Sequence, residues 1–262
     1  GVSTGTLLVE NYSDIKKIMK STKKMISFHS EDQGVLNKRK KYIKRGDPKS
    51  HPIWRNESVC LTCTKHLVKL ANLTKKKIHI LHITTAEEIE LLNKNKKFIS
   101  YEVTPQHLTL SSPSCYNKLG SLAQMNPAIR SYKHLSRLRK ALKNNEIDIV
   151  GSDHAPHTLA EKKQEYPDSP SGMPGVQTLM PILLNEVSKK TISINNVVQL
   201  TSYNPIKRFK VKNKGLIKEG YDADFTFVDL TKTKKISNKL ILSKCGWTPF
   251  HGMKIKGWPV GT

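Results

Sequence analysis

The chain has 262 residues, enough for one large α/β domain or for a domain with a small appendage. It has no run of 18 apolar residues, so no membrane-spanning helix is expected, and its four cysteines are too few for a disulfide framework. The formal net charge of +24 comes from lysines spread along the chain, without an arginine-rich recognition helix or an aromatic RNA-binding signature, so we expect solvated faces and no nucleic-acid partner.

From its N-terminus the sequence alternates short apolar segments with segments of helical periodicity. Predicted strands cover residues 25–29, 77–82, 98–104 and 147–150. Predicted helices cover residues 11–20, 57–73, 86–92 and 131–143, and residues 38–55 are expected to form a basic loop. We expect Asn11 or Ser13 to cap the first helix. This order, a β-α unit repeated about four times, predicts a parallel sheet with crossover helices.

Three of the four predicted strands end in a side chain that can bind a metal ion or move a proton. His29 and His82 end the first two strands, and Asp153 follows the fourth after a turn of small residues. Because the carboxyl ends of parallel strands meet on one face, we expect the three side chains to converge there. A carboxylate beside imidazoles can ligate a metal ion, transfer a proton, or do both. His79 faces the other side of its strand and is expected to pack or to support the site.

Two of these patterns also suit plain structural roles. Asp153 is a good residue for capping a helix after a strand-to-helix turn. Cys60 and Cys63, with His66 three residues on, have the spacing of half a zinc site. They lie within a predicted helix, however, and no second Cys/His pair is near. We therefore interpret the two cysteines as small residues on one helix face.

Six segments resemble the dihydroorotases, a family of the cyclic amidohydrolase superfamily. They are SFHSED (27–32), HILHITT (79–85), EVTPQHL (102–108), MNPAIR (125–130), GSDHAPHT (151–158) and SGMPGVQT (171–178), in the family's order and near its spacing. The resemblance covers nearly the whole chain. It implies a zinc-dependent (β/α)8 barrel enzyme that interconverts N-carbamoyl-L-aspartate and L-dihydroorotate in pyrimidine biosynthesis.

The resemblance also implies roles for individual residues. By it, His29, His82 and Asp153 are zinc ligands, and Asp153 is the catalytic residue that shuttles a proton during the reaction. The positions that match substrate-binding residues are Asn126, His157, Ser171 and Gly172. The first residues of the chain resemble a mobile loop that closes over bound substrate, with Thr4 or Thr6 as the lid contact.

Several features of the family have no counterpart here. The first-strand HxH ligands, the substrate Arg after them, a second substrate Asn and the carboxylated Lys that bridges two metals are all missing. A complete (β/α)8 barrel needs roughly 250 residues by itself. The sequence therefore predicts an α/β fold that is a partial (β/α)8 TIM-type barrel, about the last four βα units in residues 1–209, with part of a small β appendage in residues 210–262. Residues 187–202 are expected to be helical.

The predicted function is thus that of a dihydroorotase fragment, inactive or nearly so alone, with at most one zinc ion in place of two. Two alternatives stay open: another cyclic-ureide amidohydrolase, acting on a hydantoin or allantoin, and a non-catalytic remnant or half of a split protein. Asn126 and His157 favour dihydroorotate. Expected partners are the small-molecule substrate and a second copy of the chain or a complementary N-terminal half, with no membrane. The few cysteines and the lack of a secretory leader favour the cytoplasm.

Overall fold

Four parallel strands form the central sheet of the computed structural model, which describes residues 9–262. The strands run in the order β1 (Ile26–Phe28), β2 (Ile78–Ile80), β3 (Ile99–Val103) and β4 (Ile149–Val150). All four predicted strands are present, and the parallel sheet of an α/β fold is confirmed. The predicted lid contacts Thr4 and Thr6 lie outside the described residues.

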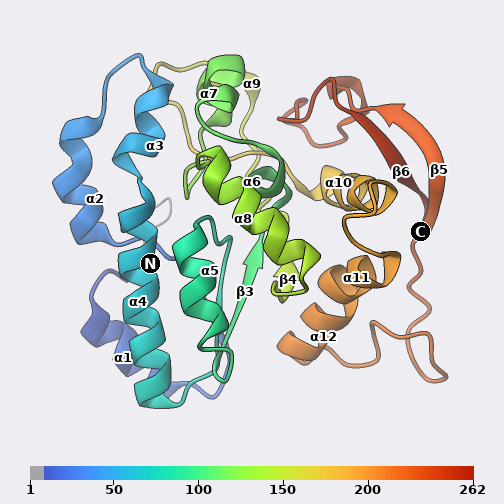
Figure 1. Cartoon of the computed structure of the whole chain (residues 1–262), viewed down its shortest axis with the longest axis horizontal. Helices are drawn as coiled ribbons and strands as arrows, with labels where there is room; N and C mark the ends of the chain where they lie inside the picture. The colour runs from blue at the N-terminus through green and yellow to red at the C-terminus, as the bar shows by residue number, and fades with distance from the viewer. Residues whose placement is uncertain (1–8) are drawn as a thin grey trace.

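Helices that alternate with the strands in sequence cover one face of the sheet. They include α1 (Tyr12–Ser21), α4 (Glu57–Thr74), α5 (Ala86–Asn93) and α8 (Tyr132–Lys143). In Figure 1, α4, α5 and α8 lie side by side in front of the strands. The main core lies between these layers, where Ile80 of β2 and Val103 of β3 belong to one cluster with Leu67 of α4. Burial of such apolar surface, at roughly 25 cal/mol per Å², is what holds the layers together.

The other face of the sheet carries polar side chains. Ser27, His79 and Ser100 stand opposite one another in register on β1, β2 and β3. The His79 ring is buried, with Nδ1 2.8 Å from Ser100 Oγ and Nε2 3.1 Å from Glu102 Oε2. His79 therefore packs within the sheet, while His82 is carried beyond its end.

Further helices occupy segments where the sequence predicted none. They are α2 (Gln33–Arg39), α3 (His51–Trp54), α6 (Pro105–Thr109), α7 (Ser114–Leu119), α9 (Leu159–Lys162) and α10 (Val176–Ser188), with 3-10 turns at Lys40–Tyr42, Pro48–Ser50, Gly120–Ala123 and Asn238–Leu240. The prediction of a basic loop over residues 38–55 is therefore wrong in part. Asp32 starts α2 by accepting a hydrogen bond from the Val35 amide, a cap that overrides the weak periodicity of the segment.

The predicted helix over residues 187–202 is also wrong near its start, over residues 189–193. Helix α10 ends at Ser188, and Lys190 takes a left-handed conformation with φ 58°. A new helix, α11 (Ile194–Val198), then begins with a capping box at Ser193, and it continues as a π-helical turn and as α12. The turn and the last helix cover Gln199–Tyr203 and Asn204–Phe209.

The C-terminal segment adds an antiparallel pair of strands, β5 (Phe227–Lys235) and β6 (Lys254–Gly261). The pair lies beside α10 at the right of Figure 1. The Lys256 amide donates to Asn185 Oδ1 on α10 over 3.1 Å. Ile182 of α10 joins Ile255 and Phe250 in a separate small core. The β appendage is thus packed directly on the helix that follows the loop of residues 171–175.

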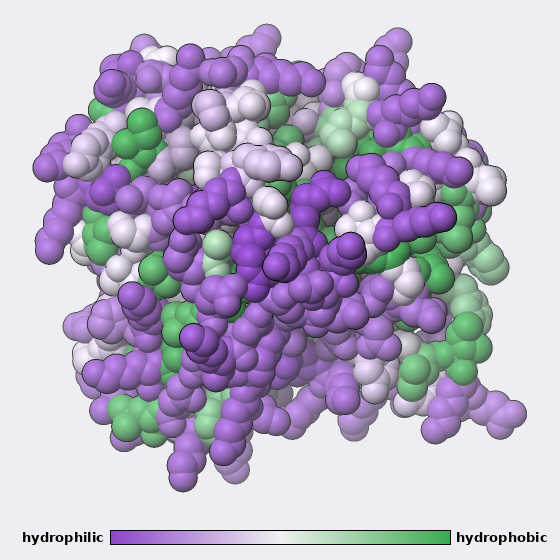
Figure 2. Space-filling view, viewed as in Figure 1, coloured by the Kyte–Doolittle hydropathy of each residue, from purple (hydrophilic) through white to green (hydrophobic). Residues whose placement is uncertain are grey.

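The surface agrees with the lysine-rich composition. Figure 2 shows hydrophilic side chains over most of the visible face, with apolar residues in small separate groups. No helix in the described part of the chain is long and apolar enough to cross a membrane.

Candidate metal and substrate site

Loops that follow three strands carry the predicted metal ligands. His29 comes directly after β1, His82 two residues after β2, and Asp153 three residues after β4. His82 and Asp153 have positive backbone φ angles, 36° and 42°. Such a conformation costs a non-glycine residue about 1–3 kcal/mol; it occurs at helix ends, as at Lys190, and also clusters at functional sites. The surrounding structure therefore holds these two side chains in directions that a relaxed strand end does not provide.

The imidazoles of His29 and His82 face each other. His29 Nδ1 lies 2.9 Å from His82 Nε2, and His29 Nε2 lies 2.9 Å from Glu31 Oε2. Burial opposes ionisation of Glu31, but the Arg55 guanidinium and the contact with His29 outweigh it and lower the pKa of Glu31 to about 2. The ionised carboxylate only accepts hydrogen bonds, so His29 Nε2 carries the proton and Nδ1 is directed at His82.

His82 is suited to act as a neutral ligand. Burial lowers the pKa of its ring well below the ordinary value, and the neighbouring His29 and His107 act in the same direction. A neutral imidazole keeps a lone pair on one nitrogen, which is the form that binds metal ions.

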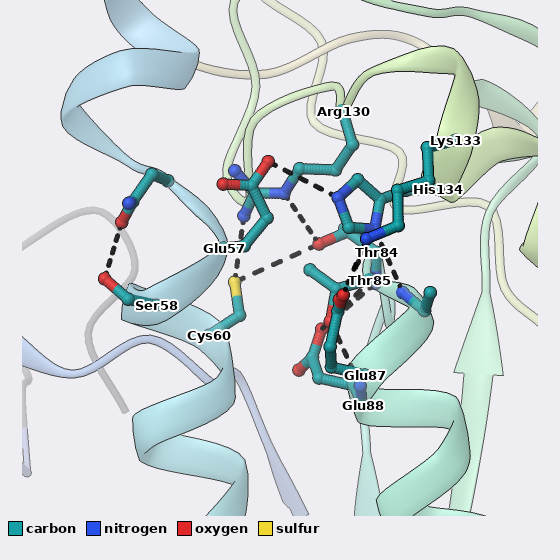
Figure 3. A network of polar contacts seen from close by, with 12 residues as sticks. Glu57, Ser58, Cys60, Thr84, Thr85, Glu87, Glu88, Arg130, Lys133 and His134 are labelled. Atoms are coloured by element: carbon teal, nitrogen blue, oxygen red, sulfur yellow. Dashed lines mark hydrogen bonds and ion pairs between the residues drawn. The ribbon is translucent and has the colours of Figure 1, made fainter.

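Two buried arginines hold Glu31 in place. Arg55 Nη1 donates to Glu31 Oε2, and Arg130 Nη1 donates to the carbonyl oxygen of Arg55. Arg130 also donates from Nε to Thr84 Oγ1 over 3.1 Å, and its Nη2 lies 3.1 Å from Cys60 Sγ. Figure 3 shows Arg130 between α4, which carries Cys60, and the loop before α5, which carries Thr84. These contacts fix the histidine pair relative to both helices, and they give Cys60 the helix-face role predicted for it.

The Asp153 carboxyl group has an electrostatic setting that favours proton exchange. Burial raises its pKa to about 6, with the His29 ring opposing the shift and the Glu102 carboxylate adding to it. Gly151 makes this arrangement possible, because a Cβ there would lie 2.5 Å from Glu102 Oε1. A carboxyl group with a pKa near neutrality can both accept and return a proton at pH 7.

The residues at the strand ends fit zinc in kind, since two neutral imidazoles and a carboxylate are donors that zinc accepts. They do not form a closed ligand set: within residues 9–262, no three His, Cys, Asp or Glu side chains are grouped so that they could hold a metal ion. The 2.9 Å between His29 Nδ1 and His82 Nε2 is a hydrogen-bond distance. The two histidines are therefore in direct hydrogen-bond contact, and within the described residues Asp153 does not complete a metal-binding group with them.

Three of the four predicted substrate positions lie close together. The Gly172 amide donates to the Gln124 carbonyl oxygen over 2.9 Å, and Gln124 Nε2 lies 3.3 Å from Ser171 Oγ. Gly172 has φ 147°, and a Cβ there would lie 2.6 Å from the Ala155 carbonyl oxygen and 3.1 Å from His157 Cδ2. A glycine is thus required for the loop to approach His157 this closely.

Asn126, the fourth predicted substrate position, lies two residues beyond Gln124 in the chain. Its side-chain oxygen Oδ1 is buried and has no hydrogen-bond partner within the described residues. A buried amide oxygen without a partner is unusual in a folded protein and is available to a ligand.

Sequence reasoning assigned no role to three residues that support these groups: Glu31, Arg55 and Lys162. The signal for Glu31 was present, because a carboxylate two residues from a predicted metal-binding histidine often orients its ring. Arg55 and Lys162 carry no local signal, since they reach the site only through contacts that are distant in the sequence.

A cavity of about 730 Å³ lies elsewhere, at the amino ends of the strands. Eight cationic side chains and one carboxylate, Asp148, line it. Asp148 is already paired with Lys96, whose Nζ lies 2.8 Å from Oδ2. The cavity contains none of the predicted site residues.

A parallel sheet that presents ligand-type side chains at the carboxyl ends of its strands is typical of α/β proteins that bind their ligands at that edge. A sequence model of the Amidohydrolase family matches residues 9–262, and the chain belongs to this family.

The curated relatives include dihydroorotases. That of Pyrococcus furiosus is 34% identical over 260 residues, which is 98% of this chain and 56% of the relative. That of Methanosphaera stadtmanae is 34% identical over 248 residues, 90% of this chain and 56% of the relative. The L-hydantoinase (dihydropyrimidinase) from Arthrobacter aurescens has a similar structure, with a TM-score of 0.90 and 23% identity over 95% of this chain and 58% of that one. The resemblance to dihydroorotases is confirmed, and the chain spans little more than half the length of these relatives.

Proposed function

We propose that the chain is part of a dihydroorotase, which interconverts L-dihydroorotate and N-carbamoyl-L-aspartate. The observation that carries the proposal is the contact of His29 with His82 at neighbouring strand ends, with Asp153 on the same edge of the sheet. Support comes from dihydroorotases that are 31–35% identical over 90–100% of the chain.

We also propose that the four-stranded sheet is about half of a (β/α)8 barrel. On this view residues 1–209 form the last four βα units, and residues 210–262 belong to a β appendage. The support is that β1 and β4 are the outer strands of the sheet and that the structural match covers 58% of the L-hydantoinase chain. The ligands absent from this chain, by the family resemblance, would come from the units that precede β1.

In the hydrolytic direction, the oxygen of water bonds to the carbonyl carbon of the ring amide, and the C–N bond then breaks. His29 and His82 would hold zinc through Nδ1 and Nε2, and zinc at this place would polarise the carbonyl group and lower the pKa of water. Asp153 would accept the proton that the water loses and deliver it to the ring nitrogen as that nitrogen leaves. Its pKa of about 6 suits both transfers. The products are a carboxylic acid, which loses its remaining proton to solvent and becomes a carboxylate, and a ureido group whose nitrogen has gained one N–H bond.

The proposed substrate contacts are Asn126, His157, Ser171 and Gly172. The hydroxyl of Ser171 and the imidazole of His157 can donate hydrogen bonds to the carboxylate of L-dihydroorotate, and Asn126 offers both a donor and an acceptor. Hydantoin and dihydrouracil lack that carboxylate. The positions of Asn126 and His157 therefore favour dihydroorotate over other cyclic ureides.

The test is a substrate comparison with the full-length protein purified with zinc. We expect kcat/KM for L-dihydroorotate to exceed that for hydantoin, dihydrouracil and allantoin by roughly 100-fold or more, because a site built to bind a polar group rejects analogues that lack it. A higher kcat/KM for hydantoin would assign the protein to the other branch of the family. No turnover of any of the four compounds, in a folded and zinc-loaded protein, would leave the non-catalytic alternative.

We propose zinc as the metal, two ions in the complete enzyme and at most one in this chain, and the cytoplasm as the compartment. The four cysteines are all free and buried, which suits a reducing environment. A second copy of the chain or a complementary N-terminal half is the proposed protein partner, because both outer strands of the sheet offer an edge for pairing.

A further inference from the structure

Lys162, the last residue of α9, has an unusual position for a lysine. Its side chain is only 1% exposed, and it is among the largest fully buried side chains of the described residues. Within residues 9–262 no carboxylate pairs with its ammonium group. Burial penalises the charged form and lowers the pKa of Lys162 to about 7, so its hydrogen bonds make up only part of the lost hydration.

The ammonium group donates to two backbone carbonyls. Nζ lies 3.0 Å from the Gln124 oxygen and 2.7 Å from the Pro170 oxygen. It also lies 6.0 Å from the centre of the Trp247 ring, a distance at which an aromatic face attracts a cation. Three segments that are far apart in sequence therefore meet at one side chain.

The two carbonyls belong to the segments that carry the proposed substrate contacts. The Gln124 oxygen that accepts from Lys162 also accepts from the Gly172 amide over 2.9 Å. The side chain of the same Gln124 donates to the Ser169 carbonyl oxygen over 2.8 Å and lies 3.3 Å from Ser171 Oγ. Residues 169–172 are thus held by hydrogen bonds to both Lys162 and Gln124.

Trp247 extends the arrangement to His157, a third of the four proposed substrate contacts. Its indole Nε1 donates to the His157 carbonyl oxygen over 2.8 Å, and the ring is 1% exposed. The ammonium group of Lys162 therefore binds the carbonyls of Gln124 and Pro170 and also lies near the ring of Trp247. Trp247 in turn binds the backbone of His157.

We propose that Lys162 is a positioning residue of the substrate site, whose ammonium group clamps residues 169–172 against Gln124 and so sets the places of Ser171 and Gly172. Lys162 does not touch the substrate in this role. The substrate contacts rest on the proposed function, whereas the clamp itself rests on the hydrogen bonds of Lys162.

The test uses the full-length, zinc-loaded protein and three variants. Lys162→Met keeps most of the side-chain volume and removes the donors, and Lys162→Gln keeps an uncharged NH2 group as donor. Lys163→Met, at the exposed neighbour, is the matched control. The readouts are exchange of the Gly172 amide hydrogen, kcat and KM measured separately, and zinc content.

In Lys162→Met we expect the Gly172 amide to exchange at least about 10-fold faster, since hydrogen bonds from a charged donor are worth that factor or more. KM should rise by about 10-fold with kcat within about 3-fold of wild type, the pattern of lost binding that is equal in ground and transition states. In Lys162→Gln the Gly172 exchange rate and KM should lie between those of wild type and Lys162→Met. Lys163→Met should match wild type in both quantities, and the zinc content should be the same in all three variants.

A Lys162→Met protein with wild-type Gly172 exchange and wild-type KM would overturn the clamp. If that variant does not fold, the same comparison is made with Lys162→Gln, and wild-type values there would overturn it equally. Failure of the full-length protein to turn over dihydroorotate would defeat the proposed function instead, and Gly172 exchange would still decide whether Lys162 clamps the loop.

Discussion

At the scale of single residues, Glu31 decides which nitrogen of His29 is free for a ligand. Its carboxylate accepts from His29 Nε2 and is held by Arg55. In Glu31→Gln the uncharged amide should fix the ring less firmly, and we expect zinc affinity of the full-length protein to fall by about 10–100-fold, the usual effect of removing a group that orients a metal-binding histidine. Competition titration with a zinc chelator measures this.

Asp32→Asn is the control for Glu31→Gln, because Asp32 is the next carboxylate in the chain but caps α2 instead of contacting His29. Asparagine is also a good cap, so zinc affinity and fold should both persist. Glu31→Gln should in addition be less stable by about 3–5 kcal/mol, since Arg55 is left buried without its partner. Wild-type zinc affinity in a folded Glu31→Gln protein would refute the orienting role.

Asp153 is the residue on which the proposed proton transfer depends. Asp153→Asn keeps the shape of the side chain and removes its ability to accept a proton, so kcat of the full-length enzyme should fall by about 10²–10⁴-fold while the circular dichroism spectrum stays unchanged. Asp224→Asn, at an exposed carboxylate paired with Lys214, should retain full activity. Ordinary turnover by Asp153→Asn would show that another group moves the proton.

At the scale of elements, buried neutral histidines link separate loops by hydrogen bonds, and the stability that these bonds contribute depends on pH. His51 Nε2 lies 2.9 Å from the Met125 carbonyl oxygen, and so it donates from a neutral ring that joins α3 to the segment of Asn126. Burial lowers the pKa of His51 to about 3, Arg55 adds to this effect, and the bond to Met125 opposes it. The pKa of His107 is lowered by burial in the same way, to about 4.

The sign of the resulting pH dependence follows from proton binding. An unfolded histidine takes up a proton below about pH 6.5, whereas folded His51 does so only near pH 3, so the unfolded state binds more protons in between. The stability contributed by neutral His51 is complete above pH 6.5 and is lost as the pH falls toward 3, at up to about 1.4 kcal/mol per pH unit. The free energy of unfolding, measured with denaturant, should therefore decrease less steeply from pH 7 to pH 4 in His51→Gln than in wild type.

His66→Gln is the control for this experiment, since His66 is an exposed histidine on α4 that stacks on Tyr12. Its stability curve should run parallel to that of wild type over the same pH range. Parallel curves for His51→Gln and wild type would mean that His51 is not held neutral in the folded state.

The sequence was informative about strands and less so about loops. The four strands were predictable because short apolar runs end at polar residues, and His29 and His82 were predictable because both stand at such ends. The short helix α2 was missed because it depends on a single cap at Asp32, and no periodicity marks it. Lys162 was missed because a buried lysine looks like any other in a chain with 45 Lys and Arg residues.

At the scale of the whole molecule, the sheet has two outer strands with nothing paired beyond them. β1 and β4 stand at its two sides, and within the described residues neither has a partner on its outer edge. Unpaired N–H and C=O groups on an edge strand favour pairing with another chain, and the +24 charge slows association without removing those groups. The isolated chain of 262 residues should therefore be inactive, and it should self-associate or bind a complementary N-terminal half.

Size-exclusion chromatography of the isolated chain beside hydrogen exchange of its strands tests this prediction. Ser27→Lys adds a charge to β1 at an exposed position, where lysine discourages edge pairing, so it should shift the chain toward monomer. Ser13→Lys adds the same charge on α1 and should leave the oligomeric state of wild type unchanged. Adding the N-terminal half should protect the amides of both β1 and β4, because closing a barrel pairs both edges at once. A sharp monomer peak with strong protection of both strands in the isolated chain would contradict the half-barrel and require that the edges be covered in another way.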